Sequence, residues 1–343
     1  MWPTSSHASL HQVSEDLKDI NRLDLDIERP EHETISRAYG QRLVPKLVRI
    51  LSAKGLEEEV ALKALDLLFV CLSNDSLKAE LAGADDGSVL INLLKGDAGT
   101  TPKVKVAACE VISKLCSFVK CRDLLYDAGL VATLLEVVSD VPEAAAEVFH
   151  RLATNRDIVN LILLDEKIIK ALVSMLDGDG SLKAKESASF CLALLARREG
   201  GIKQLLSAGI SSLLEGAKQT TSLALKEASI TTLMQICHEY EGKTAVIGAS
   251  GVETLAACLS SDEKIQTLAT AALLGLSTEL EAKEKIADLC GPRLFQLRRS
   301  LFPPLMANIK HLIASVSEYP AAKKMFEEEA KADEIRLKAQ VMA

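Results

Sequence analysis

The stretch that decides the fold is Ala188-Ser189-Phe190-Cys191-Leu192-Ala193-Leu194-Leu195. Its Ala188, Leu192 and Leu195 stand at positions i, i+4 and i+7, which share one face of an α-helix. The stretch therefore predicts a helix with one apolar face, on which the small alanine allows a neighbouring helix to approach closely. The pattern recurs in residues 64–68, 108–115, 145–152 and 269–276, and Ala228 lies between the last two copies.

The repeated alanines are 44, 37, 43, 40 and 41 residues apart, and a second pattern keeps the same spacing. It is a glycine followed by a helix with paired apolar residues. The glycines are Gly87, Gly129, Gly209 and Gly251, and Gly291 begins a variant of the pattern. We expect each glycine to end the preceding helix in a left-handed conformation, which is accessible to a residue without a Cβ atom.

A period of about 40 residues with two main helices is typical of HEAT and armadillo repeats. The order within a unit favours armadillo repeats, because a short segment such as 120–127 or 202–207 precedes the glycine, and we expect a long third helix after it. The predicted fold is all-α, a right-handed superhelical solenoid of armadillo-type repeats. Only 3% of the residues are aromatic, and helix-on-helix packing tolerates such a core.

Three regions are predicted along the chain. Residues 1–36, with eight acidic and three basic residues, form an acidic N-terminal arm. Residues 37–317 form the repeat array, with six clear units up to about 282 and a divergent seventh after it. Residues 318–343 form a charged C-terminal helix.

Composition and charge limit the classes of function that the protein can have. The net charge of −8 and the pI of about 5.4 argue against a large nucleic-acid interface, which needs a concentrated positive surface. Apolar runs such as 158–164 are too short to span a membrane, and residues 1–5 lack the order of a signal peptide. We expect a location in the cytosol or a compartment continuous with it.

No pattern of catalysis, cofactor binding or metal binding stands out. The eight cysteines include no C-x-x-C pair and fall mostly in apolar helical patterns, so we expect buried thiols. None of the six histidines forms a metal-binding pair. Gly242-Lys243-Thr244 lacks the earlier glycine of a phosphate loop, because Cys237 occupies that position, and is predicted to be a turn between units. We therefore expect a non-enzymatic protein without a cofactor or a metal ion.

The helices that follow the glycines are predicted to line a concave groove that binds partners. Trp2 is the only tryptophan and lies outside the array, so a tryptophan ladder is not expected. The polar groove positions include Thr133, Glu136, Ser174, Ser212, Glu215 and Glu253. The partner-binding residues that we predict are Arg37, Arg42, Lys46, Arg49, Asn92, Lys95, Lys170, Arg293, Arg298 and Arg299.

One segment goes beyond the general repeat. Asp26-Ile27-Glu28-Arg29-Pro30 is followed by Ala38-Tyr39-Gly40-Gln41-Arg42-Leu43-Val44-Pro45-Lys46-Leu47. Over about 20 residues it resembles the opening of the armadillo-repeat radial spoke proteins of cilia and flagella, the radial spoke head 14 homolog family.

The resemblance implies a structural subunit in the stalk or base of the ciliary radial spoke. Its partners would be other spoke subunits and axonemal docking proteins, and contact with the doublet microtubule would be indirect or through local basic patches. The expected location is the axoneme, with a cytoplasmic stage before assembly, and no nucleic acid or membrane is expected as a partner. The alternative is a cytosolic armadillo adaptor for trafficking or for GTPase regulation.

Overall fold

The structure is a computed structural model that describes residues 43–342, except for 54, 85–86, 97–99, 156–157, 160–165, 179 and 199. The predicted acidic arm, Arg37 and Arg42 lie outside the described residues. The chain divides into two compact units, Met1–Ile158 (unit 1) and Val159–Ala343 (unit 2). The predicted region boundaries near residues 36 and 317 stay predictions.

Every regular element in the described part of unit 1 is a helix. Its first described helix covers residues 43–51. The others are α3 (Glu58–Cys71), α4 (Asp75–Ala84), α5 (Ser88–Lys95), α6 (Pro102–Leu115), α7 (Val119–Asp127), α8 (Leu130–Val137) and α9 (Pro142–Ala153). Proline opens both α6 and α9, at a position where the missing N–H would have no partner within the helix.

Unit 2 continues in the same manner. Its helices are α11 (Glu166–Asp177), α12 (Leu182–Ala196), α13 (Gly201–Ala208), α14 (Ile210–Lys218), α15 (Leu223–Ile236), α16 (Tyr240–Gly248), α17 (Gly251–Cys258), α18 (Glu263–Leu276), α19 (Leu280–Leu297), α20 (Pro303–Val316) and α21 (Pro320–Met342). Side-chain caps start three of the long ones, where Ser181, Ser222 and Asp262 accept hydrogen bonds from backbone N–H groups of the first turn.

Each repeat contains two short helices and one long helix. The helices directly after the glycines are mostly short, with eight residues in α5, α8 and α17 and nine in α14. The long helix comes next, with 14 residues in α6, α15 and α18. Our prediction that the helix after the glycine is the long third helix is therefore wrong. The long helix is the one that carries the alanine pattern, and turns near residues 101, 222 and 262 separate it from the short helix after the glycine.

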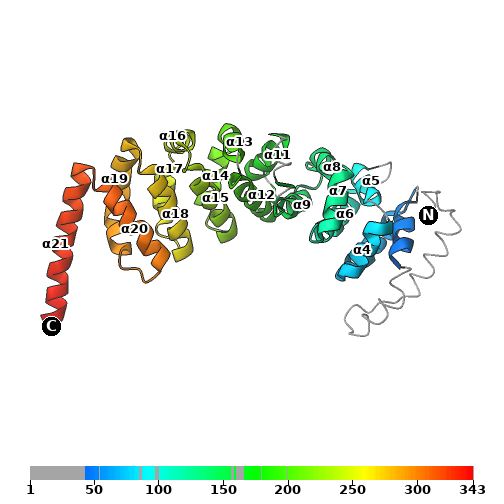
Figure 1. The fold of residues 1–343 in the computed structure, drawn as a ribbon, viewed down its shortest axis with the longest axis horizontal. Helices are drawn as coiled ribbons and strands as arrows, with labels where there is room; N and C mark the ends of the chain where they lie inside the picture. Colours follow the sequence, from blue (N-terminus) through cyan, green and yellow to red (C-terminus); the bar gives the residue numbers. More distant parts are fainter. Residues whose placement is uncertain are drawn as a thin grey trace. The chain divides into compact units, whose positions relative to one another are not determined.

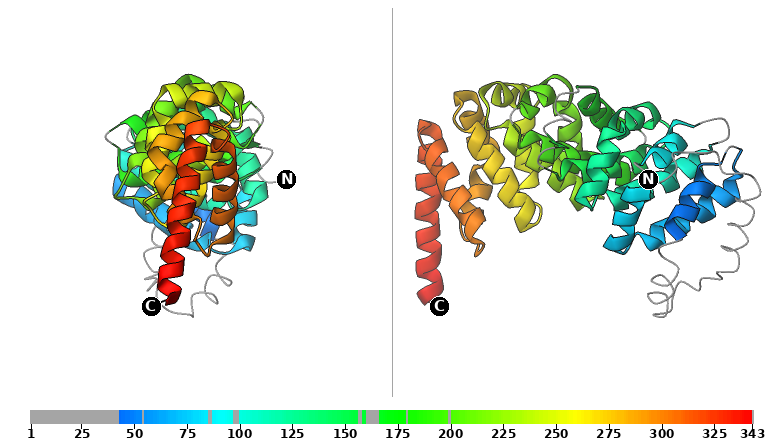
Figure 2. Two further views of the ribbon diagram at one scale, coloured as in Figure 1. Left: turned by 90° about the vertical axis from the view of Figure 1, so that its left-hand side faces the viewer. Right: turned by 45° about the vertical axis from the view of Figure 1, so that its right-hand side comes forward.

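The long helices form the main packing layer of each unit. In unit 2, α12, α15, α18 and α20 each pack on the next, and Figure 1 shows them along one side, with α13 and α16 on the opposite side. In unit 1, α3, α6 and α9 stack in the same way. Figure 2 shows the same helices from two further directions.

The repeat alanines lie in the packed interior of the repeats. They are at most 3% exposed, as the sequence predicts: Ala64, Ala108, Ala145, Ala188, Ala228 and Ala269. Close approach extends to neighbouring small residues, because the hydroxyl oxygens of Ser189 and Ser229, both fully buried, are 3.2 Å apart across the α12–α15 contact. Side chains of this size at a helix crossing bring the two backbones together.

The glycines have two different roles. Gly87 and Gly129 adopt the predicted left-handed conformation, with φ of 86° and 89°. For Gly209 and Gly251 the prediction is wrong, because Gly209 has φ of −127° and the left-handed residue before α17 is Ser250. A Cβ atom on Gly251 would lie 2.3 Å from the side chain of Val246, so close packing requires this glycine.

The last repeat departs from the predicted turn at Gly291. This residue lies inside α19, which runs without a break from Leu280 to Leu297 and contains Pro292. A Cβ atom on Gly291 would lie 2.1 Å from the terminal methyl group of Met325, so α21 packs directly against this point of α19. The first two helices of this repeat are thus joined into one.

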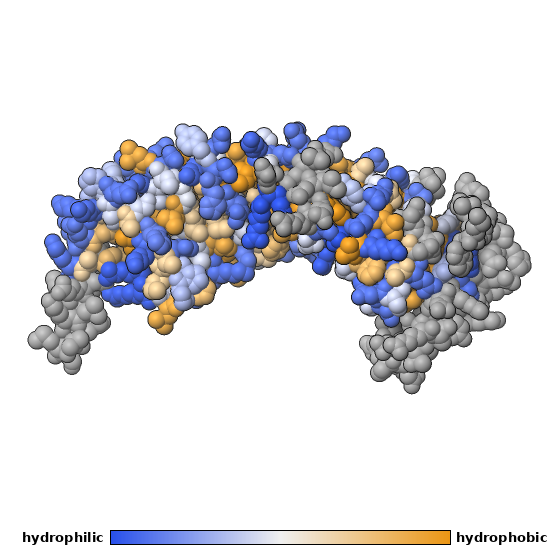
Figure 3. All heavy atoms as spheres, viewed as in Figure 1, coloured by the Kyte–Doolittle hydropathy of each residue, from blue (hydrophilic) through white to orange (hydrophobic). Residues whose placement is uncertain are grey.

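The apolar residues lie mainly in the interior, and the outer surface mixes polar residues with small apolar patches (Figure 3). Seven of the eight cysteines are buried and Cys71 is half-buried, which confirms the prediction of buried thiols. A search of the described residues found no helix with the length and apolarity that crossing a membrane requires.

Replacing Ala188 with leucine should destabilise the protein. The added atoms enter the packed interior around α12, where Ala188 is fully buried, and such overpacking costs about 1–3 kcal/mol. The free energy of unfolding in urea, followed by circular dichroism, measures the loss. The matched control is Ala321→Leu on an exposed position of α21, where the change should be about 0.2 kcal/mol. Equal effects of both substitutions would contradict this packing.

Candidate protein-interaction surface

The predicted partner-binding residues of unit 1 lie on two helices. Lys46 and Arg49 are half-buried on the helix that covers residues 43–51. Asn92 and Lys95 are exposed on α5, one turn apart. Asn92 and Lys95 thus lie on a short helix, and Lys46 and Arg49 lie on the first described helix. None of the four lies on α3, α6 or α9.

The predicted residues of unit 2 are exposed. Lys170 on α11 pairs with Glu166 at 3.5 Å. Arg293, Arg298 and Arg299 gather around the end of α19. The Arg293 side chain donates to the backbone oxygen of Leu259 at 3.2 Å.

Two of the predicted groove positions are buried instead. Thr133 on α8 is 1% exposed and its hydroxyl donates to the backbone oxygen of Gly129, while Ser212 on α14 is 7% exposed. The prediction that these side chains line an open groove is wrong. The short second helices pack against the long helices on one side and against neighbouring second helices on the other, as α14 packs on α15 and α17.

The long helices of unit 1 carry a different surface, which consists of three acidic residues. Asp66 on α3 and Glu110 on α6 are exposed, and Glu147 on α9 is half-exposed. Each lies two residues after the buried repeat alanine, so the three carboxylates occupy matching positions on three successively stacked helices. We call these three residues the acidic row. Asp66 and Glu110 have no ion-pair partner among the described residues, while Arg151 holds Glu147 at 2.9 Å.

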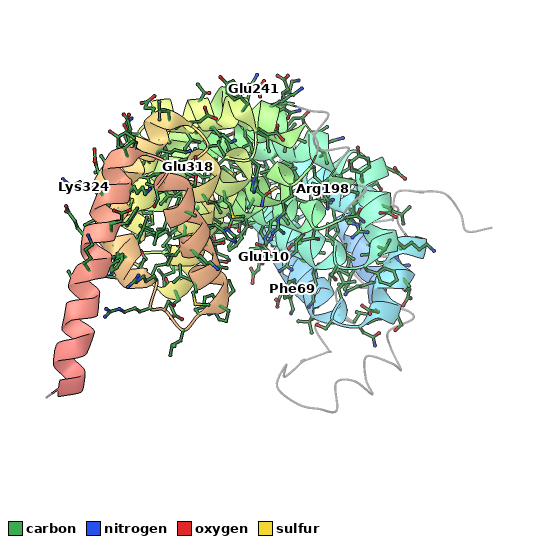
Figure 4. All side chains as sticks on the ribbon, turned by 60° about the vertical axis from the view of Figure 1, so that its left-hand side comes forward. Phe69, Glu110, Arg198, Glu241, Glu318 and Lys324 are labelled. Carbon is green, nitrogen blue, oxygen red and sulfur yellow. The ribbon has the colours of Figure 1, made fainter. Side chains whose placement is uncertain are left out.

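Apolar and basic groups border the acidic row. Phe69 and Val70 on α3 are each 38% exposed. Lys114 on α6, one turn after Glu110, lies over the Phe69 ring at 4.0 Å and donates to the Phe69 backbone oxygen at 2.6 Å. Two causes lower the pKa of Lys114: partial burial is the larger, and the nearby charge of Lys78 is the smaller. Figure 4 labels Phe69 and Glu110 on this face.

The acidic row does not extend through the described part of unit 2. The residues two positions after the repeat alanines there are Phe190 on α12, Ile230 on α15 and Ala271 on α18. The sequence carried a usable signal for the row, because an acidic residue follows the repeat alanine by two positions in the copies at Ala64, Ala108 and Ala145.

Lysine side chains link successive repeats at fixed positions. The fourth residue of the helix that begins a repeat reaches the turn before the first helix of the next repeat in three places, from α4, α16 and α19. Lys78 donates to Ser117 at 3.0 Å and Lys243 donates to Thr278 at 2.8 Å. Lys283 pairs in the same way with Glu318. We call these contacts the lysine braces, and sequence analysis missed them.

A second series of braces joins the long helices. Lys105, the fourth residue of α6, pairs with Asp140 at 2.7 Å, just before α9. Lys226, the fourth residue of α15, donates to Ser261 at 2.8 Å, just before α18. Donor and acceptor are 35 residues apart in both cases, which is a spacing that a search for repeats can detect.

The segment Gly242-Lys243-Thr244 belongs to this bracing system. It lies in the first turns of α16, while we predicted a turn between units, so that prediction is wrong. A Cβ atom on Gly242 would lie 2.1 Å from the backbone oxygen of Ile236. The glycine is therefore required by the close approach of α16 to the end of α15.

The buried thiols and His150 show the chemistry of a packed core. Burial raises the pKa of the Cys109 thiol to about 12 and lowers the pKa of His150. A buried thiol with such a raised pKa stays protonated and is a poor nucleophile. Within the described part of the chain, no three His, Cys, Asp or Glu side chains converge in a way that could hold a metal ion.

Comparison with known proteins identifies the fold. No protein-family model and no curated protein matches the chain. Among solved structures, an engineered protein from the Northeast Structural Genomics Consortium is similar over 94% of this chain and 79% of its own, with 23% identity and a TM-score of 0.74. The chain has the armadillo-repeat fold. A designed armadillo repeat protein is similar over 67% of this chain and 99% of its own, with 18% identity and a TM-score of 0.58.

A further relative in fold is a designed armadillo repeat protein in complex with the peptide (KR)4. It covers 68% of this chain and 99% of its own, with 22% identity and a TM-score of 0.59. The predicted class, all-α with armadillo-type repeats, is thus confirmed.

Two glycines of α16 should respond in opposite ways to alanine. Gly242→Ala forces a Cβ atom against the Ile236 backbone and should destabilise the protein by about 1–3 kcal/mol. Gly248→Ala meets no atom within 4 Å and should stabilise the helix by up to about 1 kcal/mol. Urea unfolding of both variants gives the comparison. A neutral Gly242→Ala would show that α16 does not approach α15 this closely.

Proposed function

We propose that this protein is an interaction scaffold whose acidic row binds basic segments of partner proteins. The observation that carries the proposal is the regular placement of Asp66, Glu110 and Glu147 on three stacked helices. Packed helices lie about 8–10 Å apart, and an extended chain rises about 3.3 Å per residue. Lysine or arginine at every second or third position of a partner can therefore meet successive carboxylates.

The bordering side chains support the same proposal. Phe69 and Val70 offer exposed apolar surface for the aliphatic stems of lysine and arginine. Among the described residues, the exposed carboxylates of Asp66 and Glu110 have no ion pair that a partner would need to break. The (KR)4 complex of a designed protein with this fold is a precedent for the ligand chemistry.

The acidic row can be tested with a fluorescent (Lys-Arg)4 peptide. We expect the purified full chain to bind it in low salt and to release it as salt screens the charges. The double variant Asp66→Lys/Glu110→Lys should weaken binding by about tenfold or more, as measured by fluorescence anisotropy.

The matched control for this test is Glu241→Lys, an exposed residue of α16 in unit 2 (Figure 4). It makes the same change of charge as one substitution of the double variant, but away from the acidic row, and it should alter affinity by less than about twofold. If Glu241→Lys weakens binding as much as the double variant, the peptide responds to net charge alone and the acidic row is not its site.

At a finer level, we propose that the partners are subunits of the ciliary radial spoke and axonemal docking proteins. The support is the resemblance of the segment from Asp26 to Leu47 to radial spoke armadillo proteins, together with a fold that suggests protein interactions. Because tubulin surfaces are acidic, a protein with a net charge of −8 is expected to reach the doublet microtubule through other proteins. The second candidate remains a cytosolic armadillo adaptor.

Location separates these two candidates. We expect a tagged protein in ciliated cells to stay with axonemes after detergent extraction and to leave in high salt, which weakens interfaces built on exposed charges. Lys46→Glu/Arg49→Glu should loosen this attachment, with circular dichroism confirming the fold. Recovery of the wild type in the detergent-soluble fraction, or abundance in cells without cilia, would favour the cytosolic adaptor.

A further inference from the structure

In unit 2, α20 is the last helix of the stack formed by α12, α15 and α18, and one of its faces has no described helix packed on it. α18 packs on α15 and on α20, whereas α20 packs on α18 and α19, and α21 packs on α19. Figure 1 shows α21 next to α19, at the end of the series of long helices. The stacking that encloses both sides of α15 and α18 is therefore open on one side of α20.

On α18, the equivalent face is covered by the neighbouring helix α20, and its polar side chains are buried. Gln266 is 7% exposed, and Thr270 and Ser277 are fully buried under α20. Asn308 of α20 donates to the backbone oxygen of Thr267 at 3.1 Å, and the hydroxyls of Ser277 and Ser315 are hydrogen-bonded at 2.9 Å. The face is therefore built to receive a helix that lies alongside.

On α20, the residues 40 positions later are exposed. Met306 corresponds to Gln266 and is 48% exposed, and Lys310 corresponds to Thr270 and is exposed. Phe302, Met306, Lys310 and Ala314 follow one another at intervals of four residues, so they form a single stripe. We call these four residues the α20 stripe.

The surroundings of the α20 stripe are both apolar and basic. Leu301, directly before it, is 96% exposed, which is unusual for a large apolar side chain. Arg298 and Arg299 lie in the same turn, and Arg298 stacks on the Phe295 ring at 3.7 Å. Residues 289–317 contain three arginines, one lysine and no acidic residue, although the whole chain has a net charge of −8.

We propose that the α20 stripe is a docking site for an acidic amphipathic helix of another protein. The open side of the helix stack favours a helical partner, because α20 would receive it as α18 receives α20. The exposed Leu301, Phe302 and Met306 require large apolar side chains on the partner. The local positive charge requires acidic residues beside them. This site is separate from the acidic row and takes a partner of opposite charge.

A peptide selection tests the chemistry of the occupant directly. A displayed library of random 16-residue peptides is selected on the purified full chain, with an excess of the Met306→Glu/Lys310→Glu variant as soluble competitor. We expect the enriched peptides to carry a net negative charge and apolar residues at helical spacing. Enrichment of peptides without both features, or no enrichment, would overturn the proposal.

The best enriched peptide is then measured by fluorescence anisotropy. Met306→Glu/Lys310→Glu should weaken its binding by about tenfold or more, while the matched control Lys324→Glu, on an exposed position of α21, should change it by less than about twofold. Asp66→Lys/Glu110→Lys should leave it unchanged, so failure here and failure of the acidic row remain distinguishable. Equal binding to the wild type and to the Met306→Glu/Lys310→Glu variant would overturn the site.

Two other possible occupants of the α20 stripe, a membrane surface and a second copy of the chain, would give different results with the same two proteins. Sedimentation with phosphatidylserine vesicles that depends on Met306 and Lys310 would assign the stripe to a membrane surface and overturn a protein partner. Self-association of the wild type that the Met306→Glu/Lys310→Glu variant abolishes, measured by analytical ultracentrifugation, would assign it to a second copy of the chain. We expect neither result. The wild type and the Met306→Glu/Lys310→Glu variant should both be monomeric, and neither should sediment with the vesicles.

Discussion

Close approach of neighbouring long helices is the constraint on which the rest of the structure depends. Ser189 of α12 and Ser229 of α15 are so small that the two backbones meet there with little side-chain volume between them. This contact determines how each long helix lies on the next, and hence where every exposed side chain of that helix points. The acidic row of unit 1 exists because the same geometry repeats at Ala64 and Ala108.

The lysine braces add a second, polar connection between repeats. In each one, a cation on the first turn of a helix reaches the turn that precedes the equivalent helix of the next repeat, as Lys78 reaches Ser117 and Lys283 reaches Glu318. An isolated exposed ion pair contributes little to stability. Here the contacts recur at matching positions, with the Lys78 and Lys283 side chains only 10% and 14% exposed, so they favour one alignment of successive repeats.

The sequence predicts the period, the helices that carry the alanine pattern and the burial of those alanines, because these features follow from apolar spacing and residue size within one segment. It does not predict the role of Gly251 or Gly291, since each is required by a side chain from another turn or helix, Val246 and Met325. The acidic row was overlooked for a related reason. Its meaning depends on which helices stack, and we assigned the partner-facing layer to the helices after the glycines. The radial spoke resemblance stays a proposal.

The lysine braces have a consequence for how such a chain can change length during evolution. A donor lies near the start of a helix and its acceptor lies 35–39 residues later, which is close to one repeat. Duplication of a whole repeat therefore copies one donor and one acceptor and leaves every brace complete. Insertion of part of a repeat moves the acceptor away from the donor. The lysine side chain then stays largely enclosed but has no partner. The braces thus restrict this architecture to growth by whole repeats.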